Sequence, residues 1–253
     1  MANGAAPPLR KLPLAGCVNF RDLGGYAVGD GRHIRWRALF RADGLAGLDE
    51  DDCAQLAGLG LATVIDLRTQ GEVETRGTFP TESFAVDYHH LPLTDVLPPT
   101  EDLARYDEPS FVTARYRQLF TEGSASLARA IRVLAEPDAL PAVFHCSAGK
   151  DRTGVLAALV LGFLGVPQSV IVEDYALSAE AMVALLARLK VEYADAADEV
   201  DRYAPAVVSV APQTMDAFLD ALHAEHGTFD DLAATLGVAD AVDALRATVL
   251  ERP

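Results

Sequence analysis

The stretch that decides the fold is PAVFHCSAGKDRTG, residues 141–154, in which a cysteine and an arginine stand six positions apart. The apolar residues before His145 predict a buried strand, and the apolar run after Gly154 predicts a helix. The turn between them places Cys146 and Arg152 at a helix N-terminus, where backbone N–H groups and the helix dipole favour negative charge. Such a turn stabilises both a thiolate and a bound phosphoryl group. The stretch therefore predicts a nucleophile that attacks phosphate.

Helical and strand patterns alternate on either side of this stretch. They predict a helix at 49–59, strands at 61–67 and 84–91, a helix at 124–134 and the strand at 141–145. This alternation implies crossover helices and a mostly parallel central sheet. Ligands bind beyond the carboxyl ends of the strands in such sheets, which is where Cys146 falls. We therefore predict an α/β fold, with a mostly parallel sheet flanked by helices, for a single domain over residues 1–253.

Two further segments complete the predicted architecture. From residue 167 to 253 the pattern is helical throughout, with helices expected at 167–181, 182–194, 213–226, 229–236 and 238–250. The segment 95–123 carries several aromatic residues among charges and is too long for an ordinary connection. It is either an amphipathic helix packed on the sheet or a mobile lid over the site, and its residues leave both interpretations open.

The composition indicates which classes of binding partner and which cellular compartment to expect. A net charge of −16 argues against nucleic acid as a partner, because non-specific affinity for it comes from clustered Lys and Arg. Three widely spaced cysteines, Cys17, Cys53 and Cys146, form neither a disulfide framework nor a metal-ligand pattern. No signal peptide or transmembrane segment is recognisable. We therefore expect a cytoplasmic protein that uses no metal or cofactor; signal-independent secretion and the oligomeric state stay open.

The residue types in the turn have distinct expected roles. Cys146 is the predicted nucleophile, and Arg152 can donate two parallel hydrogen bonds to phosphoryl oxygens that gain charge in the transition state. Thr153 can offer its hydroxyl to the departing sulfur. His145 either orients the turn or is a hydrogen-bonded residue at the end of a strand. The residues expected to contact the phosphate are Ser147, Ala148, Gly149, Lys150, Asp151, Arg152 and Thr153.

The reaction also needs a proton donor, because the leaving oxygen of a phosphate monoester must be protonated. Four aspartates compete for this role: Asp66, Asp87, Asp95 and Asp151. Asp151 lies in the turn itself, while Asp95 lies just past a predicted strand. Spacing alone does not choose among them.

These residues resemble a known family. HCSAGKDRTG contains the Cys-x5-Arg-Thr signature of cysteine-dependent protein tyrosine phosphatases, and its GKDRT portion resembles the atypical bacterial tyrosine and lipid phosphatase family. NFRDLGGY at 19–26, VIDLR at 64–68, the pair Glu72 and Val73, and EDY at 173–175 resemble further blocks of that family. The resemblance spans nearly the whole chain.

The resemblance implies a phosphatase fold and a two-step reaction through a phosphocysteine. HLPLTD at 90–95 resembles the family's general-acid loop, which makes Asp95 the preferred acid and Asp151 the second choice. The segment 95–123 is similar to the family's helical lid. Lys150 resembles a basic residue that holds a second phosphate or an inositol ring, so the implied substrates are phosphotyrosine and also phosphoserine, phosphothreonine or phosphoinositides. Inorganic phosphate is the expected product.

Two other functions fit the same residues less well. A pseudophosphatase adaptor would read phosphorylated partners through this turn, but Cys146, Arg152 and a candidate acid are all present. A sulfur-transfer enzyme of the rhodanese type also uses a loop cysteine, but the arginine, together with Lys150 and Asp151, points to phosphate.

Overall fold

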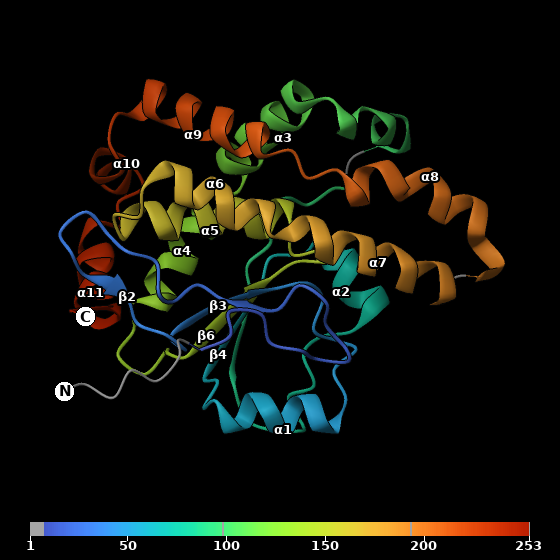
Figure 1. The fold of residues 1–253 in the computed structure, drawn as a ribbon, viewed down its shortest axis with the longest axis horizontal. Helices are drawn as coiled ribbons and strands as arrows, with labels where there is room; N and C mark the ends of the chain where they lie inside the picture. Colours follow the sequence, from blue (N-terminus) through green and yellow to red (C-terminus); the bar gives the residue numbers. More distant parts are fainter. Residues whose placement is uncertain (1–7, 98, 193, 253) are drawn as a thin grey trace.

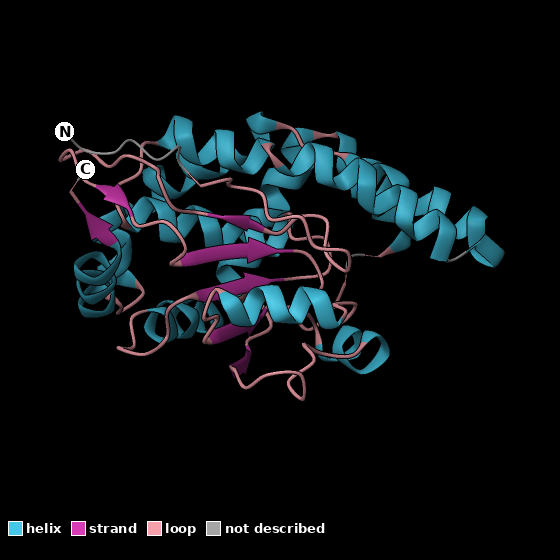
Figure 2. Cartoon of the chain, turned by 60° about the horizontal axis from the view of Figure 1, so that its bottom comes forward, coloured by secondary structure: helices cyan, strands magenta, loops and turns pink. Residues whose placement is uncertain are grey.

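A five-stranded sheet organises the computed structural model, which describes residues 8–97, 99–192 and 194–252. The strand order is β1 (Arg21–Asp22), β3 (Leu39–Ala42), β6 (Ala142–His145), β4 (Thr63–Asp66) and β5 (Asp87–His90). β1 pairs antiparallel with β3, and the other pairings are parallel. The arrowheads of the parallel strands therefore point to one end of the sheet (Figure 2). The prediction of a mostly parallel central sheet is confirmed.

The sheet separates two cores, because successive side chains of a strand point to opposite faces. Leu39 and Phe144 enter the larger core, which lies against the helices of the second half of the chain. Phe40 and Val143 enter the smaller core, which α1 (Glu50–Gly58) and the N-terminal segment complete. Figure 1 shows α1 on one side of the sheet and α4 (Ser124–Leu134) and α5 (Asp151–Phe163) on the other.

The helices after the last strand of the central sheet cover one face of it, as the helical pattern predicts (Figure 1). The predicted break near residue 181 falls instead after Leu177. The local pattern does not predict α2 (Gln70–Arg76), α8 (Ala197–Val208) or the short N-terminal strands. The remaining helices are α2 (Gln70–Arg76), α3 (Pro109–Glu122), α6 (Gln168–Ala176), α7 (Ser178–Glu192), α8 (Ala197–Val208), α9 (Pro212–His226), α10 (Phe229–Thr235) and α11 (Ala239–Val249), with 3-10 turns η1 (Thr100–Asp107) and η2 (Ala194–Ala196).

A short antiparallel pair joins a segment near residue 33 to the C-terminal segment of the chain. β2 (His33–Ile34) pairs with β7 (Leu250–Glu251), which follows α11 directly. β2 therefore lies beside α11 (Figure 1). None of the helices within the described ranges combines the length and the apolar character that crossing a bilayer requires.

The segment 95–123 folds as η1 followed by α3, apart from residue 98, which lies outside the described residues. The face of α3 that carries Val112, Tyr116, Leu119 and Phe120 is buried in the larger core. α3 packs against α5 and α9, and η1 packs against α8. α3 is therefore a packed amphipathic helix, but it lies against other helices and not on the sheet as that interpretation expected, and the mobility of the segment stays a prediction.

Candidate active site

The predicted turn connects β6 to α5 and is held from outside through its carbonyl groups. Asn19 donates from Nδ2 to the carbonyl oxygens of Ala148 (3.0 Å) and Gly149 (3.2 Å), and Arg41 donates from Nη2 to that of Gly149 (2.9 Å). The N–H of Gly44 donates to the carbonyl oxygen of Ser147 at 3.1 Å. Because C=O and N–H point opposite ways in a trans peptide, these bonds turn the following N–H groups toward the interior of the turn.

Gly149 is required by the shape of this turn. Its φ is +65°, in the left-handed region that favours glycine. A Cβ atom there would stand 2.4 Å from the carbonyl oxygen of Ala42, at the end of β3. The turn therefore lies directly against the neighbouring strand.

α5 begins in a way that leaves an anion site open. Its N-cap is Lys150, and no side chain of the described residues caps its first turn, whereas α1 and α2 both begin with capping boxes. Cys146 precedes this helix and is 2% exposed. The hydroxyl of Thr153, in the first turn, is buried and has no hydrogen-bond partner among the described residues. The end of α5 thus combines free donors, a buried thiol and a free hydroxyl.

Arg152 is held beside the turn by Glu72 of α2. The two side chains form a bidentate ion pair with distances of 2.5 Å and 2.9 Å, and Ser147 donates its hydroxyl to the same carboxylate at 2.6 Å. The N–H of Thr69 donates to Glu72 as part of the capping box of α2 (2.9 Å). Burial alone would raise the pKa of Glu72, but these donors, Arg152 above all, lower it to about 2. Glu72 is therefore ionised at neutral pH and fixes the arginine.

A buried ion cluster contacts the turn through Arg41 and stabilises it. Asp174 of α6 accepts from Arg41 (2.7 Å), Arg21 (3.2 Å) and the Tyr26 hydroxyl (3.0 Å). Burial and the charge of Arg21 lower the pKa of Arg41 to about 10, so it stays charged at neutral pH. Arg41 thus connects the Asp174 carboxylate to the carbonyl oxygen of Gly149.

His145 lies beneath the turn in a buried position. Its Nδ1 lies 3.2 Å from the carbonyl oxygen of Cys146, and its Nε2 lies 3.6 Å from Asp66. Burial lowers the pKa of His145, so the imidazole is neutral at physiological pH. Asp66 is itself buried and bonded to Arg68 and to the Tyr88 hydroxyl. Of the four candidate acids, Asp66 therefore belongs to the support of the site.

Lys150 points its amine at the end of α8. Its Nζ donates to the carbonyl oxygens of Ala206 (2.6 Å) and Ser209 (3.0 Å), and the residue is 1% exposed. Asp151, the next residue, lies 3.6 Å from the same Nζ. In this arrangement the amine is already bonded, and its expected role in holding a second phosphate stays a prediction.

Asp151 and Asp95, the two preferred acids, have different surroundings. The Asp151 carboxylate is 27% exposed and accepts from the Tyr116 hydroxyl at 2.7 Å. Burial, with the charge of Asp151 next, raises the pKa of Tyr116 well above its ordinary value, so Tyr116 acts only as a neutral donor. Asp95 is exposed in the loop after β5, and its carboxylate bonds to none of the described residues.

The chain matches a family model over nearly its full length. The model describes the tyrosine phosphatase family and matches residues 12–251, which include the turn, Glu72 and Asp174. The chain belongs to the tyrosine phosphatase family. It is a protein-tyrosine phosphatase whose predicted nucleophile and arginine lie together at the carboxyl end of the sheet.

Three relatives of this phosphatase are themselves named as protein phosphatases. The triple specificity protein phosphatase PtpB of Mycobacterium tuberculosis is 33% identical over 210 residues, which is 72% of this chain and 73% of that protein. A putative tyrosine-protein phosphatase of Cupriavidus necator is 32% identical over 169 residues, covering 62% of this chain and 59% of its own length. A tyrosine-protein phosphatase of Nostoc commune is 31% identical over 142 residues, covering 56% of this chain and 48% of its own length.

Several residues of this phosphatase's site have roles that the local sequence pattern does not indicate. The spacing of Thr69 and Glu72 is that of a capping box, which indicates the start of a helix. The same spacing does not indicate that Glu72 forms an ion pair with Arg152. Asn19 and Asp174 lie in blocks that resemble the family. Their contacts join segments more than 100 residues apart, which no local pattern encodes. Among the described residues, no group of three or more His, Cys, Asp and Glu side chains could hold a metal ion.

Proposed function

We propose that this phosphatase hydrolyses phosphate monoesters in two steps through a phosphocysteine. The thiolate of Cys146 attacks phosphorus, forming an S–P bond while the bond to the leaving oxygen breaks, and a carboxylic acid protonates that oxygen. Water then attacks phosphorus, the S–P bond breaks, and the carboxylate takes the proton from water. Inorganic phosphate leaves and the thiolate is restored.

One observation carries this proposal: the uncapped start of α5 stands beside Cys146 and Arg152. Free amides of the first turn and a guanidinium group are the donors that stabilise the oxygens of a transferring phosphoryl group. Glu72 orients Arg152 before substrate arrives, so little reorganisation is needed during the reaction. The free Thr153 hydroxyl can donate to the sulfur as it leaves phosphorus in the second step.

Asp151 is the acid that this arrangement favours, and Asp95 is the alternative. The Asp151 carboxylate lies in the first turn of α5, and Tyr116 fixes its orientation at 2.7 Å. Asp95 would have to approach the turn by a movement of its exposed loop. The sequence resemblance favours Asp95, so the two need a direct test.

The proposed substrates are phosphotyrosine in proteins and, as a broader range, phosphoserine, phosphothreonine and phosphoinositides. The broader range rests on the relative named as a triple specificity phosphatase, which shares 33% identity with this chain. It also rests on the GKDRT sequence of the turn. A substrate panel that compares kcat/KM for these classes in the native protein and in Lys150→Ala tests it, because a second-phosphate role lowers phosphoinositide turnover selectively.

The nucleophile is tested with Cys146→Ser. This variant should lose turnover of p-nitrophenyl phosphate and still bind phosphate or a phosphotyrosine peptide, because the turn and Arg152 are unchanged. Steady phosphate release by the native protein excludes the adaptor function. Turnover by Cys146→Ser comparable with that of the native protein would refute the proposed nucleophile.

The acid is tested with Asp151→Asn and Asp95→Asn side by side. Loss of a general acid costs about 10²- to 10⁴-fold in rate, and the loss grows with the basicity of the leaving group. The correct variant should therefore hydrolyse phenyl phosphate far more slowly than p-nitrophenyl phosphate, relative to the native protein. Asp138→Asn, at an exposed position, is the matched control. Equal losses on both substrates would argue against an acid role for the residue replaced.

A further inference from the structure

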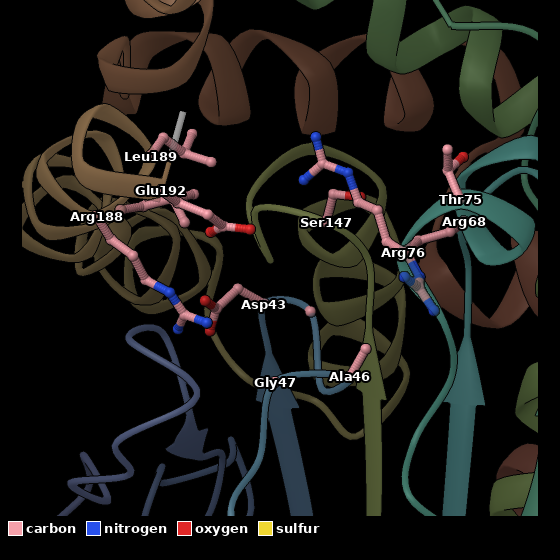
Figure 3. A pocket seen from close by; sticks show the side chains of 12 residues that line it. Asp43, Ala46, Gly47, Arg68, Thr75, Arg76, Ser147, Arg188, Leu189 and Glu192 are labelled. Carbon is pink, nitrogen blue, oxygen red and sulfur yellow. The ribbon is translucent and has the colours of Figure 1, made fainter. Parts of the chain in front are cut away.

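A cavity of about 320 Å³ opens beside the phosphate-binding turn and has no part in the reaction described above (Figure 3). Ser147, the residue after the nucleophile, lines it together with the segment after β3, the end of α2 and the second half of α7. A group bound in this cavity would therefore lie next to the turn that holds the phosphate.

Two arginines of the cavity form no ion pair with the residues that the structure describes. Arg76 is the last residue of α2, and Arg188 lies in α7; in the view of Figure 3, Ser147 lies between them. Arg76 is exposed and forms no hydrogen bond or ion pair with the described residues. Arg188 donates to the carbonyl oxygen of Gly16 at 2.7 Å and has no ion pair within the described ranges. Arg76 can donate paired hydrogen bonds to an anion, and Arg188 can donate from the guanidinium N–H groups that are not bonded to Gly16.

The other charged groups of the cavity are less available. Arg68 is buried in its ion pair with Asp66. Asp43 is also buried, and it accepts from the Cys17 thiol (2.6 Å) and the N–H of Asn19 (2.8 Å). Glu192 is exposed and forms no ion pair among the described residues, so the cavity lining carries two carboxylates, Asp43 and Glu192, beside its arginines. Arg76 and Arg188 are thus the two lining arginines that form no ion pair with the described residues, in a chain whose net charge is −16.

We propose that this cavity binds an acidic side chain of the phosphopeptide substrate, close in sequence to the phosphotyrosine. An extended peptide advances about 3.3 Å per residue, so a neighbour one or two positions away is placed beside Ser147 when the phosphate lies in the turn. A carboxylate there meets Arg76 and Arg188. This subsite rests on the proposed phosphatase function, and it supplies sequence preference that the phosphate-binding turn lacks.

The test uses pairs of phosphotyrosine peptides that differ by Glu or Gln at one of the two positions on either side. The native protein should show a higher kcat/KM for the Glu peptide at one position or more, by about two- to five-fold, as partly exposed ion pairs give. The preference should decline with added salt, because salt screens exposed charges. In Arg76→Gln/Arg188→Gln the Glu-to-Gln ratio should fall close to one. The ratio cancels any loss of activity that affects both peptides equally.

Matched variants separate this effect from net charge. Arg35→Gln/Arg129→Gln removes the same charge from two exposed positions outside the cavity and should keep the native ratio. Glu192→Gln removes the opposing charge and should raise the ratio. A native protein without Glu preference at any position, or a preference that survives Arg76→Gln/Arg188→Gln, overturns the proposal.

A binding experiment distinguishes the subsite from the catalytic proposal. Calorimetry with Cys146→Ser and the same peptides measures the Glu preference without turnover. A preference in binding together with no hydrolysis by the native protein would support the subsite and refute the catalytic function. Selectivity for a phosphoinositide that depends on Arg76 and Arg188, with no peptide preference, would show that the cavity serves a lipid headgroup and overturn the peptide subsite.

Discussion

Replacing Asp174 by Asn tests the buried cluster that supports the phosphate-binding turn. The substitution keeps the size of the side chain and removes the charge that Arg21 and Arg41 share at 3.2 Å and 2.7 Å. Burial would raise the pKa of Asp174, but the two arginines outweigh it and lower the pKa from 3.8 to about 2. That difference corresponds to roughly 2.5 kcal/mol at 1.36 kcal/mol per unit of pKa.

The expected cost of the substitution follows from these contacts. Removing one partner of a buried ion pair costs about 3–5 kcal/mol, because the other charge stays buried without compensation. We therefore expect Asp174→Asn to lower the free energy of unfolding at pH 7 by about 3 kcal/mol. Asp138→Asn, at an exposed position, should change it by less than about 0.5 kcal/mol.

The pH dependence gives a second measurement of the same cluster. The pKa of Asp174 is lower in the folded protein, so its contribution is complete above the unfolded value of 3.8 and declines as pH falls toward 2. The difference in stability between the native protein and Asp174→Asn should therefore narrow by about 1 kcal/mol between pH 7 and pH 3. Urea unfolding followed by circular dichroism measures both values. A cost below about 1 kcal/mol at pH 7, or a difference that widens at pH 3, would refute the reasoning.

Three further substitutions test other parts of the site. Gly149→Ala should destabilise the fold by more than about 1 kcal/mol in thermal unfolding and weaken phosphate binding, because its Cβ would collide with Ala42; a native melting temperature would contradict this. Glu72→Gln should lower kcat/KM about tenfold, because Arg152 is no longer held in one orientation. In the native protein the pKa of Glu72 is about 2, so the pH–rate profile above pH 4 should show no titration of this residue. Lys150→Ala should increase proteolysis within 194–209 about tenfold, because two charged hydrogen bonds to that segment are lost; unchanged cleavage would show that they contribute little.

The sequence predicts the sheet and the turn because their signals are local. The apolar run before His145 and the short run that contains Val64 are strands as expected, since buried parallel strands are apolar on both faces. β1 and β2 have two residues each, too few for a periodic pattern. α8 contains Pro205, which argues against a helix in a local analysis and is tolerated in the structure.

The site was predictable only in part, for a similar reason. Cys146 and Arg152 lie in one turn, so their spacing indicates their chemistry. Glu72, Asn19 and Asp174 reach the turn across the sheet, and their roles depend on tertiary contacts. The choice between Asp95 and Asp151 was equally non-local, because it depends on which carboxylate the fold orients.

The hydrogen bonds from Asn19 and Arg41 to the turn have a consequence for protein engineering. Ten residues carry the nucleophile and the arginine, yet the carbonyl groups of Ala148 and Gly149 take their orientation from donors more than 100 positions earlier in the chain. The motif is therefore not a portable module. Grafting HCSAGKDRTG between a strand and a helix of another scaffold would transfer its composition without its shape, unless the scaffold also supplied an amide and a buried guanidinium group behind the turn.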